Sequence, residues 1–280
     1  MRTLLLTPVL ALLACSQPPA IDRAVVKLEL ISAIQRDLLV AMEAEKSAVL
    51  ASADAESAAF AAEAKKANAE VERERLEVRR LVEIDGRPTE LAALAKFDAA
   101  WTDVVAVDER LLALAVANTN LKASRLASGE AAAAVNQLVD ALAAIEAVTA
   151  DAKVLRELSG AAVAALRIHS LLAPHIASAD EAEMTKLEEQ LRGLGSIVEQ
   201  ALANSRKSPP PAARERAAEA WEAWARYQHL NTEIVKLSRL NTNVLSYDIS
   251  VHEKRKVMIA AQNALAGLLA EVKNVPRATR

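Results

Sequence analysis

The chain has 280 residues and a formal net charge of −3 at pH 7; hydrophobic residues make up 52% of it and aromatic residues only 2%. A charge so close to zero provides no broad basic surface, so the composition argues against a nucleic-acid partner. The six glycines and nine prolines are few for this length. Alanine, leucine, glutamate, lysine and arginine dominate instead, which is typical of long helices. We therefore expect an all-α protein.

The N-terminus has the order of a secretory signal peptide: one arginine, the apolar run Leu4–Ala14, and then Cys15. This run is too short to span a bilayer, which takes about 20 residues. The tetrapeptide Leu12-Leu13-Ala14-Cys15 resembles the bacterial lipobox, although Leu13 replaces the small or β-branched residue usual there. The resemblance implies cleavage before Cys15 and lipid attachment to its thiol. An ordinary signal peptide with a chance cysteine, or a retained N-terminal anchor, is the alternative.

The lipid on Cys15 is the expected membrane attachment. We expect residues 1–14 to be the signal peptide, 15–20 a lipid tether and 21–280 a helical bundle. Cys15 is the only cysteine, so no intramolecular disulfide is expected, and no later segment has 18 consecutive apolar residues. The expected location is the cell envelope, on the periplasmic side. Serine at position 16, rather than aspartate, favours the outer membrane if enterobacterial sorting rules apply.

Proline and glycine divide the remainder into long helical segments. Residues 21–84 contain neither, which predicts one helix of about 60 residues, or about 90 Å. Asp85-Gly86-Arg87-Pro88 ends it, and Ser208-Pro209-Pro210-Pro211 is a similar break. A second helix is expected to end near Asp151, a suitable N-cap, with Ser159-Gly160 as the competing position. The third helix would then continue to about residue 206 with a bend at Pro174.

The two halves of this pattern repeat with a single offset. Pro88 and Pro211 are 123 residues apart (211 − 88), as are Trp101 and Trp224, and the tripeptide Asn118-Thr119-Asn120 recurs as Asn241-Thr242-Asn243. The sequence thus predicts two duplicated helical hairpins, about 21–150 and 151–275, which form a long antiparallel up-down four-helix bundle.

The repeated tripeptides are the candidate functional residues. Each asparagine that opens a tripeptide is in phase with an apolar stripe, so we expect Asn118 and Asn241 to lie inside the bundle. With the second and fourth helices parallel, the tripeptides would lie at the same height. Buried amides need partners. They could form a polar core layer that fixes helix register, or a ligand layer with Lys122 or Arg125 nearby for an anion. Trp101 and Trp224 are interpreted as core anchors rather than a cofactor box.

The segments around Trp101, 111–123 and 237–244 resemble the four-helix-bundle sensor domains of methyl-accepting chemotaxis receptors. In that family the bundle lies outside the cytoplasmic membrane and detects small molecules. The present chain departs from the family because no second membrane span and no methylated cytoplasmic hairpin follow. The resemblance therefore implies a sensor that passes its state to a partner.

Motifs for catalysis are missing from the sequence. His169 and His175 are six residues apart across Pro174, and His252-Glu253 lacks the second histidine of a zinc-protease helix. We expect no enzyme, no metal site and no cofactor. The expected function is a sensory or accessory module that binds a small molecule or an envelope protein; the alternative is a structural lipoprotein that acts as a rigid strut. A monomer and a homodimer both remain open.

Overall fold

The structure, a computed structural model, describes residues 20–207 and 211–274. This part of the chain is all-α and contains no strand. Its elements in chain order are α1 (Ala20–Leu50), α2 (Asp54–Asp85), α3 (Pro88–Ala117), α4 (Thr119–Leu126), the π-helix η1 (Ala127–Ala131), α5 (Ala132–Glu146), α6 (Ala152–Ala177), α7 (Glu181–Lys207), the 3₁₀-helix η2 (Pro211–Ala213), α8 (Arg214–Leu240), α9 (Thr242–Asp248), the π-helix η3 (Ile249–Lys254) and α10 (Arg255–Lys273).

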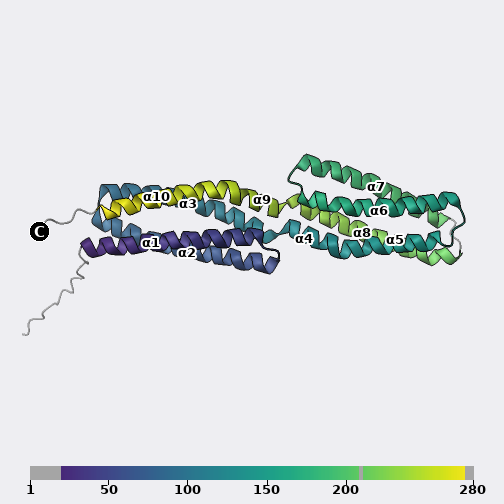
Figure 1. The fold of residues 1–280 in the computed structure, drawn as a ribbon, viewed down its shortest axis with the longest axis horizontal. Coiled ribbons are helices and arrows are strands. Elements are labelled where there is room, and N and C mark those ends of the chain that lie inside the picture. Colours follow the sequence, from purple (N-terminus) through teal and green to yellow (C-terminus); the bar gives the residue numbers. More distant parts are fainter. Residues whose placement is uncertain (1–19, 208–210, 275–280) are drawn as a thin grey trace, which may run out of the picture.

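The helices form two bodies stacked end to end, rather than one long four-helix bundle (Figure 1). The first bundle consists of α1, α2, α3 and α10, together with α9 and η3. The second bundle consists of α4, η1, α5, α6, α7 and α8. The chain passes from the first bundle to the second along α3 and α4, and returns along α8 and α9 (Figure 1). Each bundle therefore contains one local hairpin, α1–α2 in the first and α6–α7 in the second. Two further helical segments complete each bundle, one from each half of the chain.

The predicted helix of about 60 residues is wrong because the chain turns back after Leu50. No glycine or proline marks this turn. Ser57 fixes it instead, since its hydroxyl donates to the carbonyl oxygens of Ala48 and Ala115, each at 3.0 Å. The first turn of α2 also carries Asp54 and Glu56, which the positive end of the helix dipole favours.

The expected single helix bent at Pro174 is also two helices. Pro174 lies inside α6, which ends three residues later, and α7 begins at Glu181. Asp180 caps α7: its Oδ1 accepts from the amide of Ala182 at 2.8 Å and from that of Glu183 at 3.3 Å. This cap stabilises the start of a new helix, so the chain reverses rather than bends.

Two other predicted breaks are confirmed. Gly86 ends α2 in the left-handed region (φ 63°), where glycine has no steric cost, and Pro88 opens α3. Asp151 caps α6 through its Oδ1, which accepts from the amides of Lys153 and Val154. Cys15 and most of the Ser208–Pro211 break lie outside the described residues.

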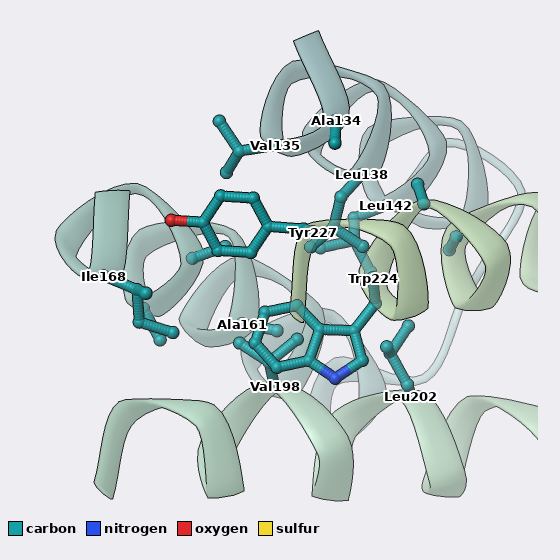
Figure 2. Packing of buried hydrophobic residues seen from close by; sticks show 14 of the residues in the cluster. Ala134, Val135, Leu138, Leu142, Ala161, Ile168, Val198, Leu202, Trp224 and Tyr227 are labelled. Atoms are coloured by element: carbon teal, nitrogen blue, oxygen red, sulfur yellow. The ribbon is translucent and has the colours of Figure 1, made fainter. Parts of the chain in front are cut away.

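Each bundle has its own apolar core. The second bundle is built around Trp224 and Tyr227, which stack with ring centroids 5.9 Å apart and pack among aliphatic side chains of α5, α6 and α7 (Figure 2). In the first bundle, Trp101 is 3% exposed, and its indole N–H donates to Glu72 at 2.9 Å. Both tryptophans therefore lie in cores, as interpreted from the sequence.

A buried charge cluster lies between α1, α2 and α3 in the first bundle. Lys27 is fully buried, and its ammonium donates to Asp85 and to Glu90, at 2.6 Å in both cases. Arg23 also contacts Asp85, and Arg87 contacts Glu90. Burial raises the pKa of Asp85, but the hydrogen bonds from Lys27 and Arg23 outweigh it and hold that pKa below its ordinary value.

Among the described residues, one helix, α6, is long and apolar enough to cross a membrane by length and composition, with an 18-residue window whose mean hydropathy is 1.2. It packs against α5, α7 and α8, and residues such as Ala161, Ala165 and Ile168 lie in the core of the second bundle. Part of its apolar surface is therefore used within the fold, since 39% of that window is buried.

Candidate functional site

The two Asn-Thr-Asn tripeptides meet where the bundles join. We call residues 118–120 and 241–243 the junction. The helices that carry them run in opposite directions, because α3 leads out of the first bundle while α8 leads into it. The expected parallel arrangement is therefore wrong, although the predicted meeting of the tripeptides is confirmed by their contacts. The two copies cross where the bundles meet (Figure 1), and reciprocal hydrogen bonds between equivalent residues give the crossing an approximate two-fold symmetry.

Asn118 and Asn241 change the direction of the chain at this crossing. They are the only non-glycine residues with positive φ in the described chain, at 50° and 51°. Asparagine tolerates the left-handed region better than other residues with a Cβ, so it can interrupt a helix without glycine. Each interruption leaves backbone amides of the next helix without helical acceptors.

The threonines satisfy two of these amides reciprocally. The amide of Thr119 donates to Oγ1 of Thr242 at 3.0 Å, and the amide of Thr242 donates to Oγ1 of Thr119 at 3.2 Å. The two hydroxyl oxygens are 3.2 Å apart. Both residues are buried, so each hydroxyl caps the partner helix in a place that water does not reach.

The asparagines that close the tripeptides repeat the exchange. The amide of Asn120 donates to Oδ1 of Asn243 at 3.1 Å, and the amide of Asn243 donates to Oδ1 of Asn120 at 3.2 Å. Their side-chain amides then reach the opposite hinge residue: Asn120 Nδ2 donates to Asn241 Oδ1 at 2.7 Å, and Asn243 Nδ2 donates to Asn118 Oδ1 at 2.8 Å. All six junction residues are thus linked by bonds between the two copies.

The symmetry fails at two pairs of side-chain amides, Asn118/Asn241 and Asn120/Asn243. Asn241 Nδ2 donates to the carbonyl oxygen of Ser178, and Asn120 Nδ2 also donates to that of Ile176, which ties the junction to the α6–α7 turn. Asn118 is fully buried, but its Nδ2 has no hydrogen-bond partner among the described residues. The junction can therefore fix helix register and crossing; its role as a ligand layer stays a prediction.

This asymmetry predicts unequal effects of two matched substitutions. Glycine keeps the left-handed backbone, so Asn118→Gly and Asn241→Gly differ mainly in the hydrogen bonds that they remove. Asn241→Gly removes two of them and Asn118→Gly one. We expect Asn241→Gly to cost about 1 kcal/mol more of unfolding free energy than Asn118→Gly. Urea unfolding measures both; equal costs, or a larger cost for Asn118→Gly, would contradict the bond assignment.

The cations expected near the tripeptides are engaged elsewhere. Lys122 donates to the carbonyl oxygen of Ala117 at 2.9 Å, at the end of α3. Arg125 contacts Asp54 and the carbonyl oxygen of Ser52, so it holds the α1–α2 turn. Among the residues that the structure describes, no group of three or more histidine, cysteine, aspartate or glutamate side chains could hold a metal ion.

The sequence interpretation missed a second polar cluster, inside the first bundle. Glu45 is 1% exposed, and its Oε1 accepts from Ser250 Oγ at 2.6 Å. Lys254 is 2% exposed and forms an ion pair with Asp108, which also accepts from Asn68. The sequence contains a signal for this cluster, because Glu45 and Asp108 are in phase with the apolar stripes of their helices. Much of the stripe around Glu45 is alanine, however, and alanine also occurs on exposed helix faces, so the pattern does not clearly mark Glu45 as buried.

The buried carboxyl of Glu45 makes stability depend on pH. Burial raises its pKa above the ordinary 4.5, and the Ser250 hydrogen bond and the charge of Lys254 offset this only in part; Asp108 and Lys46 are the other charges that act on it. The folded state then binds this proton more tightly than the unfolded state, so stability falls as pH rises from about 4.5 through the raised pKa.

We expect Glu45→Gln to flatten this fall in the melting temperature, whereas Glu43→Gln on the exposed face of α1 leaves it unchanged. Parallel curves for wild type and Glu45→Gln would refute it.

Comparisons with known proteins place this geometry in a structural context. No protein-family model matches the chain, and no curated protein matches it. Among solved structures, the sensor domain of the V. parahaemolyticus histidine kinase sensor TorS superposes with a TM-score of 0.52 at 13% identity, over 92% of this chain and 100% of that chain. The two chains are therefore similar in fold. At 13% identity the likeness shows the fold alone. The expected resemblance to chemoreceptor sensor domains is therefore supported only as a likeness of helical folds.

Proposed function

We propose that the chain is a non-enzymatic sensory or accessory module, anchored by a lipid on Cys15 outside the cytoplasm, that binds a small molecule or a protein partner. One observation carries the sensory part: the fold follows the full length of a histidine kinase sensor domain, which is a helical module. The lipid anchor rests on the lipobox-like sequence around Cys15 alone.

The architecture supports this role because two helical paths, each interrupted at the junction, connect the two bundles. A change of packing in one bundle must act on α3–α5 or α8–α10, and both paths pass through the junction. Packed interfaces of this kind tend to have a few discrete arrangements rather than a continuous range. In our proposal, ligand or partner binding at one bundle changes the crossing of these helices, and the other bundle passes the change to an envelope partner.

The anchor is tested by replacing Cys15 with serine. We expect the wild-type protein to incorporate labelled palmitate and to sediment with the envelope, since it would carry more than the two membrane signals that stable anchoring requires. Cys15→Ser should incorporate none and should leave the membrane fraction. Palmitate incorporation or membrane retention equal to wild type in Cys15→Ser would contradict the anchor.

The sensory role is tested on the same background. Cys15→Ser removes the only cysteine, so Lys65→Cys on α2 and Glu189→Cys on α7 can carry a pair of spin labels, one on each bundle. Both positions are exposed. Amino acids, organic acids, aromatic compounds and amines are screened by melting temperature. We expect at least one class to raise it and to change the distance between the labels. A strut would show no ligand-dependent melting shift and one unchanged distance distribution.

A further inference from the structure

A groove opens in the first bundle between α1 on one side and the end of α9, η3 and the first turns of α10 on the other. Its volume is about 470 Å³, within the range of small-molecule sites. Apolar side chains form most of its walls. They include Met42, Val49, Tyr247, Val251, Met258 and Ile259. An elongated apolar body would bury its surface here.

One carboxylate oxygen of a residue that lines this groove is unsatisfied. Glu45 lines the groove, and its side chain is almost completely buried. Its Oε1 accepts from Ser250, whereas its Oε2 has no hydrogen-bond partner among the described residues. A buried acceptor without a donor destabilises the fold, and more so when it is charged. A donor delivered by a ligand would remove this cost.

The local charge favours a cationic donor. Two buried carboxylates, Glu45 and Asp108, act on one buried ammonium, that of Lys254, and Lys254 is paired with Asp108. One further positive charge would balance the cluster. Lys46 and Arg255 also line the groove, but both are exposed, so solvent screens them. The apolar walls disfavour a second positive charge on the ligand.

The second bundle shows that the fold does not need this cluster. Glu45 lies five residues before the end of α1, and the fifth residue before the end of α6 is Leu172, which is buried. Lys254 is the last residue of η3, and the last residue of η1 is Ala131, also buried. One half of the molecule thus fills this place with apolar side chains, while the other keeps a buried acid and a buried lysine beside a groove.

We propose that this groove binds a small organic monoamine with an apolar body, whose ammonium group donates to Glu45 Oε2 and whose body lies against the aliphatic walls. The inference names a ligand class and a site for the sensory role, and in that respect it rests on the proposed function. The binding itself is a separate claim about residues of the first bundle.

Calorimetric titration of the whole protein with compounds that share a seven-carbon chain tests the claim. Heptylamine, heptanol and heptanoate differ in their polar group, and diaminoheptane carries an amine at each end. We expect heptylamine to bind about tenfold more tightly than heptanol, because a charged hydrogen bond is added, and heptanoate to bind least. Diaminoheptane should bind more weakly than heptylamine. Binding of heptanoate as tight as that of heptylamine would overturn the proposal.

Two sets of variants locate the site. Glu45→Gln should weaken heptylamine binding about tenfold or more, while Glu43→Gln, two residues away on the exposed face of α1, should leave it unchanged. With the offset of 123 residues, Asp108 corresponds to Asn231 (231 − 108 = 123). The triple variant Glu45→Leu, Asp108→Asn, Lys254→Ala therefore gives the first bundle the residues of the second. It should melt no lower than wild type and should not bind the amine. Unchanged heptylamine binding in either the single or the triple variant would overturn the proposal.

The outcomes separate this inference from the proposed function. If heptylamine binds at Glu45 without a change in the distance between the labelled bundles, the groove assignment stands and the sensory role fails. If another compound class shifts both the melting temperature and the distance while heptylamine does not bind, the sensory role stands and the groove assignment fails.

Discussion

Lys27→Met is expected to lower the free energy of unfolding by about 3–5 kcal/mol, because it leaves buried carboxylates without their shared ammonium. Among the contacts of the described residues, Lys27 is the only cation that reaches both Asp85 and Glu90, and Glu90 is itself fully buried. Arg23 and Arg87 would each retain one carboxylate, but neither bridges the pair. Methionine keeps most of the apolar length of lysine, so the loss is mainly electrostatic. Urea unfolding followed by circular dichroism gives the value.

A matched substitution on an exposed lysine isolates this effect. Lys65→Met, on the solvent face of α2, should change the unfolding free energy by no more than about 0.5 kcal/mol. Adding Glu90→Gln to Lys27→Met should recover part of the loss, since it removes one of the stranded charges. If the unfolding free energy of Lys27→Met lies within about 0.5 kcal/mol of the wild-type value, the buried ion cluster does not stabilise the first bundle as argued.

The second large effect is expected at the junction. Thr119→Val combined with Thr242→Val preserves the side-chain shape but removes both hydroxyl acceptors, so two buried backbone amides lose their partners. At about 1–3 kcal/mol for each unsatisfied amide, the double variant should lose about 2–6 kcal/mol. The stability losses of the two single variants should not sum to the loss of the double variant, because each hydroxyl also contacts the other.

Thr232→Val is the control for this pair. Its hydroxyl donates to the carbonyl oxygen of Gln228 on an exposed face of α8, where water can replace the bond. It should change the unfolding free energy by less than about 0.5 kcal/mol. A double junction variant no less stable than this control would mean that the reciprocal threonine bonds do not hold the two bundles together.

Parts of the fold that depend on local chemistry were predictable from the sequence. Gly86 and Pro88 mark the end of one helix and the start of another, and Asp151 is a cap that the repeat placed correctly. The turn at residues 51–53 was not predictable in this way, because Ser57 fixes it with a bond to Ala115 of another helix. A tertiary bond of this kind leaves little trace in the helix pattern. Without this turn, the helix pattern predicts one long bundle instead of two stacked bundles.

The junction was predictable as a meeting point but not as a geometry. The offset of 123 residues identified the tripeptides and placed Asn118 and Asn241 inside apolar stripes, and both are buried. Their antiparallel crossing follows from where each hairpin packs, which the repeat alone does not determine. The positive φ of the two asparagines also looked like ordinary helix in the sequence, since asparagine occurs in both conformations.

Hydrogen exchange at four backbone amides tests the central claim most directly, namely that a sensory change passes through the junction. The amides of Thr119, Asn120, Thr242 and Asn243 donate to side-chain acceptors of the opposite copy. They should be protected in the free protein. With the compound that shifts the melting temperature bound at saturation, we predict that their exchange rates change about tenfold or more, while amides in the middle of α7 keep theirs. Equal exchange at the four junction amides in the free and bound protein would contradict the account.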